Sequence, residues 1–182
     1  MASDYGLNFG FRRSDESMAT REGRFKTPDS GSALLQGSAV QLDPAEPGYL
    51  KQCAANAVPL TGLTGLLVQE EGHIPDLFNQ VLMNGHDSYD LGACKLDQLS
   101  VMWAGVGTKV WFRNTAAYSR GGRTKDAVTV VNVAGVAIGD PLIWDGSKWV
   151  KGDGDPVGWL TVTAVSGTAA TAGAYVEAVV TF

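Results

Sequence analysis

The stretch GDPLIWDGSKWVKGDGDPVGWLTV, residues 139–162, decides which fold the sequence predicts. It contains a short apolar segment, a turn at Asp145-Gly146, a second apolar segment and, after a break that contains glycine and proline, a third. Short apolar segments separated by such turn residues are typical of antiparallel strands. The stretch therefore predicts three consecutive strands joined by tight turns.

A similar pattern occurs earlier, in GSAVQLDPAEPGYLKQCAANAVPLTGLTGLLV, residues 37–68. Asp43 stands where Asp145 stands, after a short apolar strand that a glycine opens. More loosely, residues 105–115 resemble residues 171–182. A pattern that recurs along a chain indicates a repeated structural unit.

We therefore predict a mainly β protein made of two related small β-barrel or β-sandwich units. The first spans residues 32–115 and carries an insertion at about residues 70–100; the second spans residues 127–182. Residues 116–126 are interpreted as a flexible linker, because their Arg-Gly-Gly-Arg centre is polar and rich in glycine. Hydrophobic residues make up 45% of the chain, which is enough to build a folded core.

The insertion contains the one helical pattern, HIPDLFNQVLMNG, residues 73–85. Its apolar residues recur three and four positions apart and would share one face of a helix over residues 74–84. Leu77, Phe78 and Val81 on that face are a candidate subunit contact. Whether the helix faces its own core, a sister subunit or solvent stays open.

Residues 1–31 form a separate arm with alternating apolar residues and a pair of arginines. The residues concerned are Tyr5, Leu7, Phe9, Phe11, Arg12 and Arg13. Period-two alternation suits an extended segment laid against a surface. Two interpretations remain: a disordered terminus, or an arm that becomes ordered on a partner.

Charge and hydropathy exclude several classes of function. The net charge is −5 and no basic stripe is present, which argues against a nucleic-acid partner. No apolar run approaches the roughly 20 residues that span a membrane, so no membrane association is expected. Cys53 and Cys94 lack metal-ligand spacing and are expected to be free thiols in a reducing compartment, although a disulfide between them stays open.

No catalytic constellation can be assembled from the sequence. His73 and His86 would lie roughly 18 Å apart, at opposite ends of the predicted helix. Asp145, Asp153 and Asp155 fit ordinary turns better than a calcium loop, because the further acceptors of such a loop are missing. We therefore expect no enzyme activity, no cofactor and no metal site.

Tryptophan is the remaining unusual feature. The five tryptophans all lie in predicted strands, at positions 103, 111, 144, 149 and 159. Trp144 and Trp149 flank the Asp-Gly turn and could meet across a hairpin. Core packing is one interpretation, and a stacking surface for sugars is the other.

Residues 127–182 resemble the head decoration proteins of tailed bacteriophages, also called capsid cement proteins. The resemblance rests on Gly139, Asp145, Gly146, Val150, Gly158 and the final strand YVEAVV at residues 175–180. It extends less well to residues 32–68, and it covers neither the arm nor the insertion.

The resemblance implies a structural protein on the outer capsid surface of the virion, made in the host cytoplasm. Such a protein would bind the major capsid protein as a homotrimer and stabilise contacts between capsid subunits, without a cofactor. The arm would complete a sheet with the capsid, with Phe9 and Phe11 as anchors and Arg12 and Arg13 facing an acidic patch. The alternatives are a tail-tube or head–tail joining protein, and a carbohydrate-binding β-module.

Overall fold

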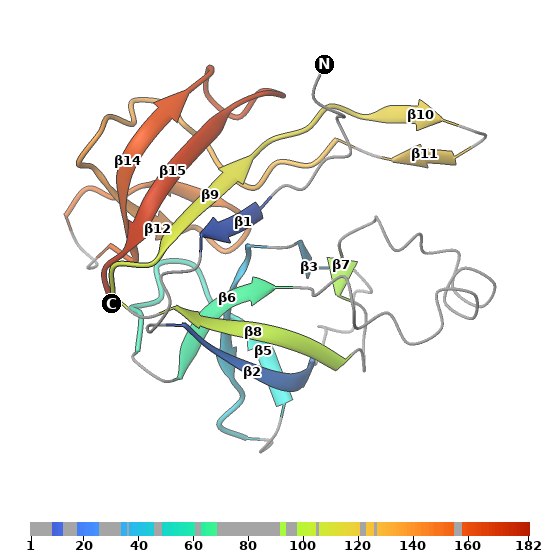
Figure 1. The fold of residues 1–182 in the computed structure, drawn as a ribbon, viewed down its shortest axis with the longest axis vertical. Coiled ribbons are helices and arrows are strands. Elements are labelled where there is room, and N and C mark those ends of the chain that lie inside the picture. Colours follow the sequence, from blue (N-terminus) through green and yellow to red (C-terminus); the bar gives the residue numbers. More distant parts are fainter. Residues whose placement is uncertain are drawn as a thin grey trace.

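The computed structural model describes most of the predicted strands and leaves out the predicted helix. The described residues are 9–12, 18–25, 34–35, 37–45, 49–60, 63–68, 92–93, 98–104, 106–120, 123–125, 127–154 and 158–182. The protein is mainly β, as expected from the sequence, and two larger sheets dominate it (Figure 1). The predicted helix at residues 73–85, with Leu77, Phe78 and Val81, lies outside the described residues, as does Cys94.

The first sheet is a closed ring of five strands. In order around the ring they are β2 (Met18–Phe25), β5 (Tyr49–Gln52), β4 (Ala39–Leu42), β6 (Thr64–Val68) and β8 (Gln98–Ala104). Neighbouring strands are antiparallel except β2 and β5, which are parallel. Part of the predicted N-terminal arm, β2, is therefore one of the strands that close the ring.

The second sheet has six antiparallel strands. Their order is β1 (Phe9–Arg12), β9 (Lys109–Arg113), β15 (Tyr175–Val180), β14 (Leu160–Ser166), β12 (Pro141–Trp144) and β13 (Trp149–Lys151). Residues 109–113, which form β9, were expected in the first unit because of their place in the sequence. In the structure β9 lies in the second sheet, hydrogen-bonded to β1 on one side and to β15 on the other. Alternation indicates a strand but does not specify which sheet the strand joins. The partners of β9 on β15 lie 62 or more residues further along the chain.

Two small sheets complete the described structure. The strand β3 (Leu34–Leu35) pairs with β7 (Gly92–Ala93), and β10 (Tyr118–Arg120) pairs with β11 (Arg123–Lys125). The segment that the sequence suggested as a flexible linker, residues 116–126, contains this β10–β11 hairpin. Figure 1 shows that the hairpin projects away from both larger sheets.

The two larger sheets share a strand order. It is β5-β4-β6-β8 in the first sheet and β13-β12-β14-β15 in the second, so the earliest strand of each set lies between the next two. Gly37 and Gly139 precede these early strands with φ angles of 81° and 91°. Their N–H groups donate to the carbonyls of Leu67 and Val162 on the third strand, each over 2.8 Å.

The turns after the two early strands also match. The Asp145 carboxylate accepts hydrogen bonds from the N–H groups of Ser147 and Lys148, both over 2.7 Å. The Asp43 carboxylate accepts one from the N–H of Ala45 over 3.0 Å. An aspartate that bonds the backbone a few residues on is a common way to start a turn. The aspartates that the sequence repeats therefore carry turns.

Three tryptophans form the centre of the core. Trp144, Trp149 and Trp159 are each at most 1% exposed. Trp149 packs against both others, with ring centroids 5.2 and 5.6 Å apart, and Trp144 and Trp149 are register partners across the hairpin. Phe112 and Phe182 extend the cluster, so aromatic rings from β9, the β12–β14 region and the C-terminus meet in one place.

The same tryptophans join the two larger sheets. Each indole N–H donates to a main-chain carbonyl in residues 37–57, which carry β4 and β5. The bonds run from Trp144 to Cys53 (3.2 Å), from Trp149 to Gly37 (2.8 Å) and from Trp159 to Ala57 (2.8 Å). A buried indole needs such an acceptor, because an unpaired N–H in a core is costly.

We predict that Trp149→Phe destabilises the protein more than Trp111→Phe does. The first change leaves the buried carbonyl of Gly37 without its indole partner, at a cost of about 1–3 kcal/mol, in addition to lost packing. Trp111 is half-buried on β9 and is the matched control. Urea unfolding of both variants measures the difference, and equal losses would contradict this account of the contact between the sheets.

Asn114 is a second buried link, placed directly after β9. Its side-chain amide donates to the carbonyls of Val131 (2.7 Å) and Thr171 (3.3 Å). Its side-chain oxygen accepts from the N–H groups of Val130 (2.9 Å) and Val131 (3.1 Å). One side chain thereby satisfies backbone groups from two segments that lie outside the named strands.

We expect Asn114→Ala to lower the free energy of unfolding by about 3 kcal/mol, because it leaves several buried backbone groups unpaired. Asn132→Ala is the matched control: its side chain bonds the N–H of Ala134 in an exposed turn, and its loss should stay within about 0.5 kcal/mol. Thermal and urea denaturation would test both variants. A small effect at Asn114 would show that water replaces its bonds.

Candidate interaction surface at the edge of the second sheet

The candidate surface begins at the edge where the N-terminal segment joins the second sheet. β1 pairs with β9 in the register Phe9–Phe112, Gly10–Trp111, Phe11–Val110 and Arg12–Lys109. Among the described strands, β1 pairs only with β9 and is therefore the edge strand of this sheet. Open edges present unpaired backbone groups that can accept a further strand.

The predicted arm residues are only partly described. Phe9, Phe11 and Arg12 belong to β1, whereas Tyr5, Leu7 and Arg13 lie outside the described residues. The alternation of the arm predicted an extended segment on a surface, and β1 is extended. The strand that it lies against is β9 of its own chain.

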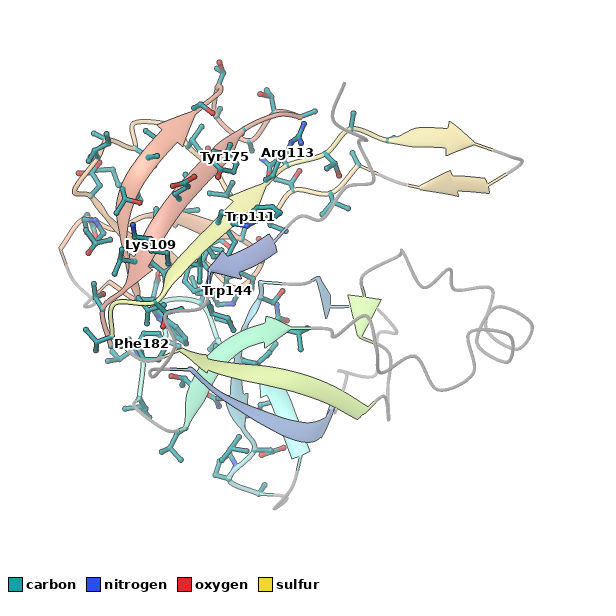
Figure 2. The ribbon with its side chains drawn as sticks, viewed as in Figure 1. Lys109, Trp111, Arg113, Trp144, Tyr175 and Phe182 are labelled. Atoms are coloured by element: carbon teal, nitrogen blue, oxygen red, sulfur yellow. The ribbon has the colours of Figure 1, made fainter. Side chains whose placement is uncertain are left out.

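Beside this edge, β9 and β15 present a mixed aromatic and charged face. On β9, Val110 and Phe112 are buried, while Lys109, Trp111 and Arg113 alternate with them and reach solvent. In the register of the sheet, Arg113 lies opposite Tyr175 and Trp111 opposite Glu177. Figure 2 shows Lys109, Trp111, Arg113 and Tyr175 along these two strands.

Contacts on this face hold its side chains in place. The rings of Trp111 and Tyr175 lie 6.4 Å apart and tilted, and the Tyr175 hydroxyl donates to the Glu177 carboxylate over 2.6 Å. We call Lys109, Trp111, Arg113, Tyr175 and Glu177 the sheet face. Tryptophan, tyrosine and arginine are enriched at protein interfaces, and Trp111, Tyr175 and Arg113 bring these three residue types together here.

Of the residues of the sheet face, the sequence points to Trp111 as a tryptophan and to Tyr175 and Glu177 only as part of the strand YVEAVV. The signal for the others is the alternation of KVWFR and YVEAVV, which predicts one buried and one solvent-facing row on each strand. Arg113 and Tyr175 are neighbours across the sheet although they are 62 positions apart in the chain. Local alternation carries no information about such a distant partner, so the face could not be assembled from the sequence.

The tryptophans divide between the core and this face. Trp144, Trp149 and Trp159 are buried, which supports core packing for these three rather than a stacking surface. Among the tryptophans whose side chains the structure describes, Trp111 alone is half-exposed. A row of exposed tryptophans is therefore not present in the described part of the chain.

Charged groups near the turns are paired. Lys151 bonds the Asp140 carboxylate over 2.7 Å, and this bond lowers the pKa of Asp140. Partial burial by itself would raise the pKa of Asp145, but hydrogen bonds from the N–H groups of Lys148 and Ser147 lower it below its ordinary value. These carboxylates stabilise turns and are held in their charged form.

Cys53 is unsuited to nucleophilic chemistry. Burial raises the pKa of its thiol to about 12, so the thiolate is scarce at neutral pH.

Among the described residues, no group of three or more His, Cys, Asp or Glu side chains could hold a metal ion. Within the same residues, no helix has the length and apolar character needed to cross a membrane.

The chain matches no protein-family model, and no curated protein matches it.

Asp145 should make part of the stability depend on pH. Its pKa is lower in the folded state, so its contribution is present above the unfolded pKa of about 4 and is lost as pH falls through the folded value. Asp145→Asn should therefore lower the urea midpoint at pH 7 and have a smaller effect at pH 3. The exposed Asp153→Asn is the control, and an Asp145→Asn effect that is the same at both pH values would contradict the assignment.

Proposed function

We propose that the protein is a structural virion protein that binds the outer surface of an icosahedral capsid and stabilises contacts between major capsid subunits. The observation that carries the proposal is the pairing of β1 with the edge of the second sheet. An N-terminal strand that lies at an open edge can extend the sheet into a partner by strand addition.

The repeated strand order supports the family resemblance. We infer that the two larger sheets derive from copies of one small β-unit, closed as a barrel in the first copy and open in the second. Residues that carry the resemblance have roles in this fold: Asp145 starts a turn, and a Cβ on Gly158 would lie 2.5 Å from the Cβ of Pro141. These structural roles support a resemblance in fold.

A capsid-binding role does not require a large binding free energy from each copy of the protein. A homotrimer would engage several capsid subunits at once, and multivalent attachment strengthens binding without requiring strong individual contacts. In this arrangement β1 and the sheet face would lie against the major capsid protein. The protein would need no cofactor and no catalytic group.

The alternatives make different predictions about assembly. A tail-tube or head–tail joining protein would form rings, commonly of six subunits, in place of trimers. A carbohydrate-binding module would need exposed aromatic rings, and three of the four tryptophans whose side chains the structure describes are buried. Light scattering on a sizing column distinguishes a capsid-binding homotrimer, expected at three times 19.2 kDa, from a ring of six subunits.

Deleting residues 1–12 should weaken binding to the capsid by at least about tenfold, because it removes β1. A deletion of residues 1–31 is less informative, because it also removes β2 from the closed ring. Co-sedimentation with expanded heads that lack the protein measures binding, and deletion of residues 1–4 is the control. Unchanged binding after removal of residues 1–12 would overturn the role of β1.

A further inference from the structure

The dipeptide Asp-Gly occurs twice in the chain, at residues 145–146 and 153–154. Both glycines have positive φ angles, 97° and 104°, which residues with a side chain rarely adopt. In such a pair no side chain shields the glycine nitrogen, which can attack the carboxyl carbon of the preceding aspartate. The two pairs therefore share the same local chemistry, and their surroundings decide whether they react.

The first pair is held on several sides. One carboxylate oxygen of Asp145 accepts hydrogen bonds from the N–H and the hydroxyl of Ser147 and from the N–H of Lys148, over 2.7 to 2.9 Å. The other oxygen lies 3.3 Å from the Lys148 ammonium. The Gly146 carbonyl accepts from the Gln52 side-chain amide over 2.9 Å. Hydrogen bonds to an ionised group are strong, so both the side chain and the backbone of this turn are fixed.

The second pair lacks these contacts. The Asp153 side chain is exposed, and within the described part of the chain no hydrogen bond or ion pair holds it or the backbone of Gly154. A Cβ on Gly154 would meet nothing within 4 Å, whereas a Cβ on Gly146 would lie 3.4 Å from the Cβ of Ala55. The carboxyl carbon of Asp153 is therefore free to approach the nitrogen of the next residue.

The second pair also lies where the fold can accept a change in the backbone. It belongs to the connection between β13 and β14, and both ends of this connection are bonded to β12. The Gly152 N–H donates to the Pro141 carbonyl over 2.8 Å, and the Trp159 N–H donates to the Leu142 carbonyl over 2.9 Å. An extra backbone atom at Asp153 falls between these anchors and outside both strands.

We propose that Asp153 is a site of spontaneous isomerisation to isoaspartate, and that Asp145 is protected from this reaction. The Gly154 nitrogen attacks the side-chain carboxyl carbon of Asp153, a C–N bond forms, a C–O bond breaks, and one water leaves. A second water then opens the resulting succinimide at either carbonyl, which gives aspartate or isoaspartate. Water is the only co-reactant, so the modification accumulates with the age of the folded protein. The inference goes beyond the proposed function and does not depend on it.

The test ages the full-length folded protein at mildly acidic pH and physiological temperature for several weeks. Peptide mapping by mass spectrometry, with fragmentation that distinguishes isoaspartate from aspartate, measures the two sites separately. Isoaspartate at residue 153 should exceed that at residue 145 by at least about tenfold, because freeing the Asp145 carboxylate costs at least one hydrogen bond to a charged group.

Three controls separate the effect of the structure from that of the sequence. In protein unfolded with guanidinium both pairs are unprotected and should isomerise at similar rates. Asp153→Glu should remove the signal, because glutamate would have to close a larger ring. Asp155→Glu should leave it unchanged, because Asp155 precedes a proline, whose nitrogen carries no hydrogen.

Two results would overturn the proposal. One is an absence of isoaspartate at residue 153 in the aged folded protein. The other is a ratio between residues 153 and 145 that is the same in folded and unfolded protein, since the structure would then protect neither site.

Discussion

Three indole N–H groups hold the two larger sheets together, and the rest of the structure depends on them. Each tryptophan belongs to residues 144–159, and each acceptor carbonyl belongs to residues 37–57. The rings fill the centre of one hydrophobic cluster to which both sheets contribute. Separating the sheets would expose this cluster and leave the indoles without their partners, so the two sheets behave as parts of one core.

The strands and turns could be predicted from the sequence because their signals are local. Asp145-Gly146 marks a turn, and the apolar segments beside it place Trp144 opposite Trp149. The partners of distant segments could not be predicted in this way. Nothing near Trp149 indicates that its indole reaches Gly37, 112 residues away, and nothing in KVWFR indicates that β9 joins the second sheet.

For the candidate surface, too, the strands could be predicted from the sequence and their partners could not. Alternation in the arm indicated an extended segment, and β1 is extended, but its partner β9 could not be inferred from the arm alone. Asn114 shows the same limit: a polar residue after a strand resembles any loop residue until the backbone groups around it are known. Hairpin residues 118–125 resemble a linker in sequence, because they are polar and lack the apolar alternation that marks a strand. In the structure they pair with one another.

The position of β1 also affects how the chain responds to mechanical force. β1 and β15 both run antiparallel to β9, on opposite sides of it, so the strands nearest the two termini are parallel to each other. Tension between the N-terminus and the C-terminus would therefore load both ladders in shear, with their hydrogen bonds sharing the force. A sheet pulled in this geometry resists rupture better than one whose bonds open in succession.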